Sequence, residues 1–302
     1  MQVSSCQQRW WLASRGMTTP LKRRAVRVGD LVFDVSVAGE AEGAPVALLL
    51  HGFPQSSASW DLVVPQLADA GVATLAPDQR GYSPGARPGD VDDYRLDALV
   101  GDVLGLCDAL ELDRVHLVGH DWGAIVAWTV AARHPDRVAA LTALSVPHPA
   151  SFAWAIRQDP EQREKSGYME FFQQTGPAED LLLADDAAGL RIGFGDAVPA
   201  GLADRHIRLL GEPGAMTAAL NWYRAKGDDW AAVPPVAVPT TFLWGSNDIA
   251  VMRPGVDRCG EFVTGEYEFV ELDRVGHWLP EEVPGEVATA VLARVHGSAR
   301  LD

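Results

Sequence analysis

One stretch decides how the rest of the sequence is interpreted: Val115-His116-Leu117-Val118-Gly119-His120-Asp121-Trp122-Gly123. Its first four residues form a short, mostly apolar run, which is typical of a buried strand. Residues 124–134 contain neither glycine nor proline, end on two basic residues and precede Pro135, so a helix is expected there. The glycines on both sides of the turn indicate a strained backbone at Asp121, where larger neighbouring side chains would collide.

A strand, a sharp turn and a helix in this order form a nucleophile elbow, whose central side chain projects from the edge of an α/β sheet. The Gly-x-Asp-x-Gly pattern is weak evidence by itself, because both residue types are frequent in this chain. The central residue is Asp121 rather than serine or cysteine. A carboxyl group with a reference pKa of about 3.9 is ionised at neutral pH, so it needs no base to act as a nucleophile.

The composition is that of an acidic globular protein with enough residues, 302, to bury one large core. A net charge of −16 argues against binding to nucleic acid, which requires a basic face, and against anionic membranes. Cys6, Cys107 and Cys259 lie far apart in the sequence. Their spacing indicates neither a zinc site nor a disulfide framework.

No run reaches the roughly 18 apolar residues that a membrane span requires. The N-terminus has a short Trp10-Trp11-Leu12-Ala13 cluster but lacks the apolar region and cleavage site of a signal peptide. We therefore expect a cytoplasmic protein. Residues 1–20 are expected to be a disordered leader, with Met17 as an alternative start of translation. A monomer and a homodimer are both compatible with the sequence.

Apolar runs and helical spacing alternate along most of the chain. A hairpin is expected at 26–37, strands at 46–50, 72–76, 138–144, 240–244 and 268–272, and helices at 60–70, 94–110 and 284–295. This alternation predicts a mostly parallel, doubly wound α/β sheet. Residues 150–232 have short helical runs and no convincing strand. We therefore expect a core formed by 21–149 and 233–302, with 150–232 inserted as a helical cap.

Polar residues that follow the late strands supply partners for Asp121. Ligands and catalytic groups gather at the carboxyl ends of such strands, where Asp248 follows 240–244 and His277 follows 268–272. The chain order of nucleophile, acid and histidine is that of a catalytic triad on an α/β sheet. Asp273 is a competing acid, but it lies on the loop of His277 itself and is expected to be a solvated charge. The strand at 138–144 is followed by Ser145-Val146-Pro147, which offers no carboxylate.

Backbone N–H groups of Phe53 and Trp122 are expected to form an oxyanion hole, because they follow a strand end and the nucleophile respectively. Both side chains would then also line the substrate pocket. The alternative is that His51-Gly52-Phe53-Pro54 is only a turn that ends a strand.

With these pieces assembled, the chain resembles an epoxide hydrolase of the α/β-hydrolase superfamily over about residues 25–296. The matching motifs are His51-Gly52-Phe53-Pro54, Asp78-x-Arg80-Gly81-Tyr82-Ser83, Gly119-His120-Asp121-Trp122-Gly123 and Gly276-His277-Trp278. The resemblance implies the α/β-hydrolase fold with a helical cap. One departure is Gln55, where relatives more often carry glutamate.

The resemblance also implies two cap tyrosines that hold the epoxide oxygen. Tyr168 lies in a Tyr-x-x-x-Phe-Gln setting and Tyr223 in an Asn-Trp-Tyr-Arg setting. Asp121 would form an alkyl ester with an apolar epoxide, and His277, oriented by Asp248, would activate the water that releases a vicinal diol. The chemistry requires no metal and no organic cofactor. Further pocket residues are expected among the aromatic side chains Phe172, Trp222 and Trp278.

Two other functions remain as alternatives. A haloalkane or haloacid dehalogenase would use the same Asp-His-Asp residues, but haloalkane dehalogenases usually have Asn at the position of Phe53, and fluoroacetate dehalogenases have Arg at that of Trp122. Release of halide from halogenated substrates would identify this activity. A non-catalytic receptor of the same fold would bind a ligand tightly without turnover. A serine esterase is disfavoured, because the elbow carries no serine.

Overall fold

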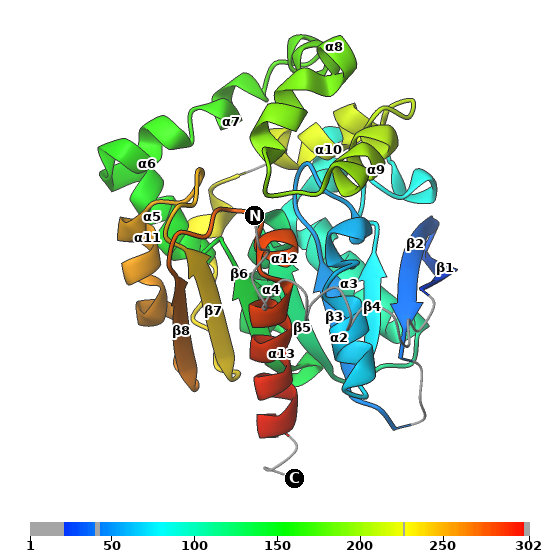
Figure 1. Ribbon diagram of the computed structural model, residues 1–302, viewed down its shortest axis with the longest axis vertical. Helices are drawn as coiled ribbons and strands as arrows, with labels where there is room; N and C mark the ends of the chain where they lie inside the picture. The colour runs from blue at the N-terminus through cyan, green and yellow to red at the C-terminus, as the bar shows by residue number, and fades with distance from the viewer. Residues whose placement is uncertain (1–20, 40–42, 226, 299–302) are drawn as a thin grey trace, which may run out of the picture.

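An eight-stranded sheet forms the centre of the molecule, in the order β1-β2-β4-β3-β5-β6-β7-β8 (Figure 1). The computed structural model describes residues 21–39, 43–225 and 227–298, so the predicted leader with Met17 lies outside the described residues. The strands are β1 (Lys22–Val28), β2 (Leu31–Ala38), β3 (Val46–Leu50), β4 (Ala73–Pro77), β5 (Val115–His120), β6 (Val138–Leu144), β7 (Thr240–Gly245) and β8 (Tyr267–Leu272).

Strand direction follows the apolar pattern of the sequence. The predicted hairpin is formed by β1 and β2, and β2 also pairs antiparallel with β4. All other pairs are parallel. Every residue of β5 and β7 is buried, as expected for parallel strands covered on both faces. The mostly parallel sheet predicted from the sequence is confirmed.

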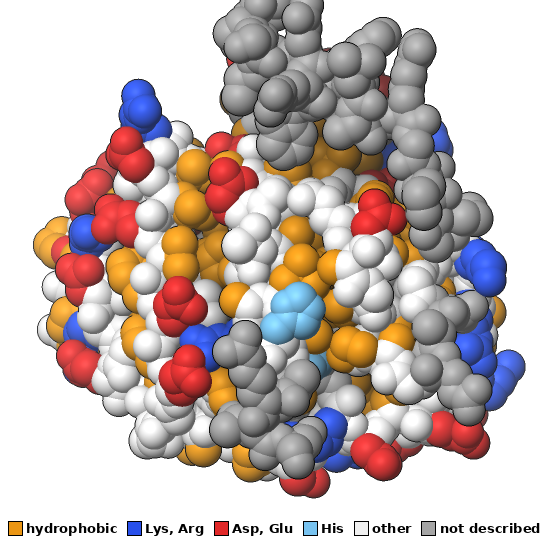
Figure 2. Space-filling view, turned by 60° about the horizontal axis from the view of Figure 1, so that its bottom comes forward, with side chains coloured by type: hydrophobic (Ala, Val, Ile, Leu, Met, Phe, Trp, Pro, Cys, Tyr) orange, Lys and Arg blue, Asp and Glu red, His pale blue; other side chains and the backbone are white. Residues whose placement is uncertain are grey.

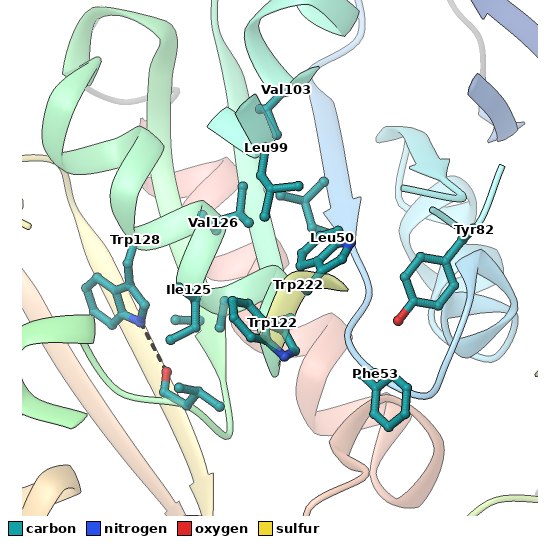
Figure 3. Close-up of a cluster of buried hydrophobic side chains, with 14 of the residues drawn as sticks. Leu50, Phe53, Tyr82, Leu99, Val103, Trp122, Ile125, Val126, Trp128 and Trp222 are labelled. Atoms are coloured by element: carbon teal, nitrogen blue, oxygen red, sulfur yellow. Dashed lines mark hydrogen bonds between the residues drawn. The ribbon is translucent and has the colours of Figure 1, made fainter. Parts of the chain in front are cut away.

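Helices cover both faces of the sheet and give each face its own apolar core. On one side lie α2 (Val64–Asp69) and α13 (Pro284–Ser298), whose apolar side chains surround Trp60. On the other lie α3 (Leu96–Ala109) and α4 (Trp122–Arg133) (Figure 1). Figure 3 shows part of this second core, in which the Trp128 indole N–H donates to the Val146 carbonyl at 3.1 Å.

The remaining short helices lie in loops of the core. They are η1 (Ser57–Trp60), η2 (Pro84–Ala86), η3 (Val91–Tyr94), η4 (Pro135–Arg137), α11 (Arg253–Asp257), η6 (Cys259–Phe262) and α12 (Leu279–Glu282). The helix predicted at 60–70 is shorter in the structure, because Ser56 caps a separate 3-10 turn and α2 starts only at Val64. Pro65 lies in the first turn of α2, where a missing backbone N–H is tolerated.

Residues 150–232, which we call the cap segment, consist of helices joined by turns and short loops in their described part and lie above the sheet in Figure 1. The division of the chain into a core and a cap stays a prediction. An interruption in α8 at 184–187, where the backbone leaves helical geometry, divides that element in two. The elements of this region are α5 (Pro149–Gln158), α6 (Pro160–Lys165), α7 (Tyr168–Phe171), α8 (Pro177–Phe194), α9 (Ala200–Leu210), α10 (Ala215–Arg224) and η5 (Asp228–Ala232).

The surface carries charges of both signs. On the face in Figure 2, acidic and basic side chains are interspersed among apolar ones rather than gathered by sign. Within the described part of the chain, Cys107 and Cys259 are buried and free of disulfides. No helix among the described residues is both long and apolar enough to cross a membrane.

Candidate active site

Asp121 occupies a strained turn between β5 and α4. Its φ of +53° and ψ of −119° are unusual for a residue with a side chain, and such conformations cost about 1–3 kcal/mol. Close backbone packing explains the flanking glycines. A Cβ atom at Gly123 would lie 2.1 Å from the Leu50 carbonyl oxygen, and one at Gly119 would lie 2.3 Å from the Gly123 carbonyl oxygen. The turn therefore has the geometry of the predicted elbow.

Two backbone N–H groups hold the Asp121 carboxylate. The N–H of Phe53 donates to its Oδ1 at 2.8 Å, and the N–H of Trp122 also hydrogen-bonds to it. The loop after β3 approaches so closely that a Cβ at Gly52 would lie 2.2 Å from Oδ1. The two donors predicted for an oxyanion hole thus converge on a single carboxylate.

His277 lies between two carboxylates. Its Nδ1–H points at Asp248, 2.8 Å from Oδ2 and 3.0 Å from Oδ1. Asp248 is itself oriented by the backbone N–H groups of Ala250 and Val251, which donate to Oδ1 at 2.8 and 3.0 Å. On the other side of the ring, Nε2 lies 3.6 Å from Asp121 Oδ2. The structure therefore brings together the three predicted residues of the triad.

The two carboxylates determine the charge on the histidine. Burial disfavours the imidazolium, but attraction to Asp248 and hydrogen bonds with Asp121 and Asp248 outweigh it and raise the pKa of His277 to about 10. Burial likewise opposes the charge on Asp121, yet the hydrogen bond and positive charge of His277 keep the pKa of this carboxyl below its ordinary value. These interactions favour an ionised Asp121 beside a protonated His277 in the resting site.

The main chain of His277 is fixed by residues that the sequence interpretation did not single out. Its carbonyl oxygen accepts hydrogen bonds from Ser145 Oγ at 2.7 Å and His120 Nε2 at 2.8 Å. Because the partner is a carbonyl, His120 must carry its proton on Nε2. The sequence signal was present, since His120 precedes the nucleophile and Ser145 follows β6, another strand ending at the same edge. The competing Asp273 is exposed to solvent, as expected.

Tyr223 lies over the elbow. Its ring packs edge-on against Trp122 and Phe53, with ring centroids 5.1 and 5.4 Å apart, and its phenol hydrogen-bonds to the Trp122 indole. Tyr168, on α7, hydrogen-bonds to Tyr223 through its own phenol. Burial, followed by nearby charges that include the Asp121 carboxylate, raises the pKa of both phenols. Both phenols therefore remain protonated and able to donate hydrogen bonds.

The predicted pocket residues fall into two groups. Phe172 packs against Phe53 and Tyr223 with centroids 5.4 and 5.0 Å apart, so it belongs to the aromatic cluster around the elbow. Trp222 donates to the Arg80 carbonyl at 2.9 Å and packs beside Trp122 (Figure 3). That contact joins α10 to the core, and a role for Trp222 as a pocket wall stays a prediction.

Trp278 also connects the core with the cap segment. Its indole N–H donates to the Gly193 carbonyl of α8 at 3.0 Å, and its ring packs against Phe194 and His277 at centroid distances of 5.2 and 5.0 Å. Its role as a pocket wall likewise stays a prediction. Trp230, in η5 at the end of the cap segment, packs edge-on against Trp122, with ring centroids 5.0 Å apart. The sequence interpretation did not predict this contact.

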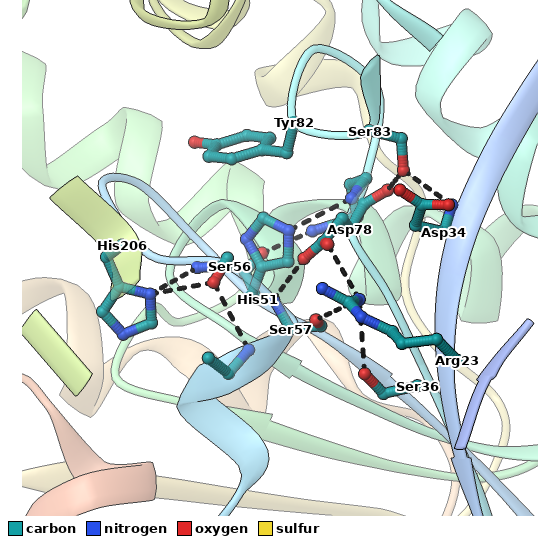
Figure 4. Close-up of polar contacts among 12 residues, drawn as sticks. Arg23, Asp34, Ser36, His51, Ser56, Ser57, Asp78, Tyr82, Ser83 and His206 are labelled. Carbon is teal, nitrogen blue, oxygen red and sulfur yellow. Dashed lines mark hydrogen bonds and ion pairs between the residues drawn. The ribbon is translucent and has the colours of Figure 1, made fainter. Parts of the chain in front are cut away.

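A polar network supports the loop that carries Phe53 (Figure 4). Asp78 accepts hydrogen bonds from the Ser57 N–H at 2.8 Å and from the Arg23 guanidinium at 2.9 Å. His51 Nε2 accepts from the Gln79 N–H at 3.1 Å, and its ring packs edge-on against Tyr82 at 4.5 Å. The second sequence motif, which begins at Asp78, therefore holds the first one in place.

Within the part of the chain that the structure describes, no group of three or more His, Cys, Asp or Glu side chains is arranged to hold a metal ion. The triad consists of two carboxylates on either side of one imidazole, joined by hydrogen bonds. This arrangement is suited to nucleophilic attack by a carboxylate followed by base-assisted hydrolysis.

Comparison with known proteins identifies the family. The alpha/beta hydrolase fold family matches residues 45–284. Epoxide hydrolase A of Mycobacterium tuberculosis is 35% identical, covering 91% of this chain and 97% of its own. The crystal structure of epoxide hydrolase A from Mycobacterium thermoresistibile has a TM-score of 0.80 at 31% identity, covering 92% of this chain and 99% of that one.

A second solved structure, a Bacillus megaterium epoxide hydrolase in complex with an inhibitor, has a TM-score of 0.82 at 26% identity over 90% of this chain and 100% of its own. Similarity at this level extends over the core and the cap segment together, because the aligned regions span nearly the whole chain. The chain therefore belongs to the alpha/beta hydrolase fold family and, within it, to the epoxide hydrolases.

Proposed function

We propose that this protein converts an epoxide to a vicinal diol through a covalent ester of Asp121. The observation that carries the proposal is the position of the Asp121 carboxylate, with Oδ1 bound to the Phe53 N–H and Oδ2 facing His277. The two protonated phenols of Tyr168 and Tyr223 belong to the aromatic cluster above it. A nucleophile, its hydrolytic base and two acids thus lie close to one another.

In the first step, Asp121 attacks an epoxide carbon. The N–H of Phe53 holds Oδ1, so Oδ2 is the oxygen free to form the new C–O bond, and Oδ1 becomes the ester carbonyl. The epoxide C–O bond breaks, and its electron pair passes to the departing oxygen. Tyr168 and Tyr223 hydrogen-bond that oxygen, and one of them supplies its proton. Raised phenol pKa values favour the protonated form that this step requires.

Formation of the ester changes the role of His277. The charge of Asp121 is lost, which lowers the pKa of His277 from the raised value of the resting site. The imidazolium gives up its proton, which through solvent restores the phenol that donated in the first step. The neutral ring then accepts a proton from a water that attacks the ester carbonyl. The resulting oxyanion at Oδ1 receives the N–H groups of Phe53 and Trp122, after which the diol leaves and the carboxylate is restored.

The aromatic cluster of Phe53, Trp122, Phe172 and Tyr223 supports an apolar epoxide as substrate. Such rings bury apolar surface while only the two phenols offer polar contacts to the epoxide oxygen. Styrene oxide, a trans-disubstituted aryl epoxide and a fatty-acid epoxide form a suitable first panel, with diol as the measured product.

The test is to trap the ester with His277→Gln. This variant keeps Asp121 as nucleophile but lacks the base, so incubation with an epoxide should add the mass of one substrate molecule to the protein. Asp121→Ala is the control and should gain no mass. Normal turnover by His277→Gln would exclude the two-step mechanism. Halide release from a haloalkane, without diol formation from any epoxide, would instead support the dehalogenase alternative.

A further inference from the structure

Two adjacent glutamates follow the histidine loop, and their side chains make different contacts. Glu281 and Glu282 end the short helix α12, which begins two residues after His277. Glu281 is buried and accepts a hydrogen bond from the Gln55 amide. Glu282 instead turns back toward the residues on either side of His277. The mechanism described above uses neither glutamate.

Both oxygens of Glu282 bind the backbone of the histidine loop. Oε2 accepts from the Gly276 N–H at 2.9 Å, and Oε1 accepts from the Trp278 N–H at 3.0 Å. One carboxylate thus binds the backbone N–H groups of the two residues that flank His277. Hydrogen bonds from N–H groups to an ionised carboxylate are shorter and stronger than those between neutral groups.

The glycine before the histidine makes room for this carboxylate. A Cβ atom at Gly276 would lie 2.8 Å from Glu282 Oε1 and 3.3 Å from Oε2, closer than a side chain tolerates. Gly276 has no positive φ, so its backbone conformation alone does not require glycine. A side chain at Gly276 would therefore displace the Glu282 carboxylate from its place in the histidine loop.

The Glu282 contacts complete the support of His277. Its carbonyl oxygen is held by Ser145 and His120, and its ring by Asp248, but none of these contacts binds the N–H groups of Gly276 and Trp278. The Glu282 carboxylate binds both N–H groups, one of them in the peptide group whose carbonyl Ser145 and His120 hold. We propose that Glu282 is a positioning residue for His277, acting in the hydrolysis of the alkyl-enzyme.

The two steps of the reaction depend unequally on this support, an inference that rests on the proposed function. In alkylation, the nucleophile is held by the elbow and by the N–H groups of Phe53 and Trp122, none of which contacts Glu282. In hydrolysis, Nε2 of His277 must reach a water beside the ester carbon. A displacement of about 1 Å at such a step reduces the rate roughly 10²-fold.

The experiment compares wild type with Glu282→Gln and Glu282→Ala in single-turnover reactions with styrene oxide. The alkyl-enzyme and the diol are followed separately by rapid quench and mass spectrometry. Glu286→Gln, an exposed glutamate at the start of α13, is the control and should behave as wild type. We expect hydrolysis to slow about 10- to 100-fold in Glu282→Ala and less in Glu282→Gln, with alkylation changed less than about 3-fold. The alkyl-enzyme should therefore accumulate.

Each outcome bears on one of the two proposals. If wild type forms neither ester nor diol from any epoxide, the proposed function is wrong. If wild type forms both and the Glu282 variants hydrolyse the ester at the wild-type rate, the positioning role is wrong. Equal losses in both steps would mean general damage to the fold and would also overturn it. Glu282→Gln has nearly the same shape as glutamate, so it carries the test if Glu282→Ala fails to fold.

Discussion

The triad and the two cap tyrosines are held by different kinds of interaction. Asp121, Asp248 and His277 each follow a strand of the sheet, and hydrogen bonds of 2.8–3.0 Å fix Asp248, the His277 ring and Asp121 Oδ1. Tyr168 and Tyr223 lie on cap-segment helices, where packing of aromatic rings with centroids 5.0–6.1 Å apart is their main contact, and their phenols hydrogen-bond to each other and to the Trp122 indole. Hydrogen bonds define direction as well as distance, whereas ring packing tolerates small displacements.

This difference indicates how the two regions can vary. A displaced Asp121 would lose its N–H donors at once, because the elbow is confined by backbone atoms of neighbouring segments. The tyrosines can shift with the helices that carry them while their rings remain in contact. We expect the core to fix the nucleophile and the base, and the cap segment, which carries both acids, to influence which epoxides the site accepts.

The largest expected effect comes from the phenols. Tyr168→Phe and Tyr223→Phe keep the ring packing and remove only a hydroxyl, so each should slow alkylation about 10- to 100-fold, and the double variant about 10³-fold or more. Stopped-flow or rapid-quench measurement of ester formation gives these rates. Tyr267→Phe, which removes the same group from β8, is the matched control.

Unimpaired ring opening by the double variant would mean that the tyrosines take no part in the mechanism. The contrast between the triad and the cap tyrosines would then have no bearing on catalysis. If the two single variants differed in their relative alkylation rates with small and large epoxides, the result would show that the two tyrosines respond differently to the size of the substrate. That result is expected if the cap segment adapts to the substrate, because Tyr168 is only partly buried whereas Tyr223 is fully enclosed.

The core half of the site follows from sequence patterns because it depends on local structure. An apolar run that ends in a polar residue marks a strand end, and parallel strands bring such ends to one edge of the sheet. Asp121, Asp248 and His277 could therefore be proposed from three separate motifs. The tyrosines of the cap segment, Tyr168 and Tyr223, could not be derived in this way. They came from resemblance alone, because packing between helices leaves no comparable local pattern.

Contacts between segments that are distant in sequence could not be predicted from the sequence. The strand ends place His120 and Ser145 at one edge of the sheet, but no local pattern indicates that both would bind the His277 carbonyl. Nor does one indicate that Glu282 rather than Glu281 would turn back to the histidine loop. Side-chain direction at these points is decided by tertiary packing.

The elbow and the cap segment should also respond differently to an added methyl group. Gly123→Ala would place a Cβ 2.1 Å from a carbonyl oxygen of Leu50, and backbone atoms there cannot move aside. We expect it to lower the free energy of unfolding by about 3 kcal/mol. Gly189→Ala, on α8, meets no atom within 4 Å and should raise it by about 0.5–1 kcal/mol, because glycine weakens helices.

Urea unfolding of both variants beside wild type measures these differences. Equal stability of Gly123→Ala and wild type would mean that the elbow can relax, and the contrast between a rigid core and an adaptable cap segment would be lost. A destabilised Gly189→Ala would show instead that α8 is packed more tightly than its open surroundings indicate.

Glu281 is a buried carboxyl group between the core and the cap segment, and its ionisation should make the free energy of unfolding depend on pH. Burial raises the pKa of Glu281 to about 8, although the hydrogen bond from Gln55 opposes this. His206 of the cap segment lies 3.7 Å away, and burial lowers its pKa to about 3, so it stays neutral and offers no compensating charge. Glu282 and His277 are the other charged groups near enough to affect Glu281.

A carboxyl group with a pKa raised on folding stabilises the protein while it keeps its proton. In the unfolded chain Glu281 ionises near pH 4.3, so between about pH 4 and 8 the folded state binds more protons than the unfolded state and loses stability as the pH rises. Glu281→Gln cannot ionise and leaves His206, Glu282 and His277 in place. Its unfolding free energy relative to wild type should therefore increase from pH 5 to pH 8, by about 3.5 kcal/mol, in thermal or urea unfolding. If the difference in unfolding free energy between Glu281→Gln and wild type did not change with pH, Glu281 would already be ionised in the folded protein. The contact between the core and the cap segment would then tolerate a buried charge.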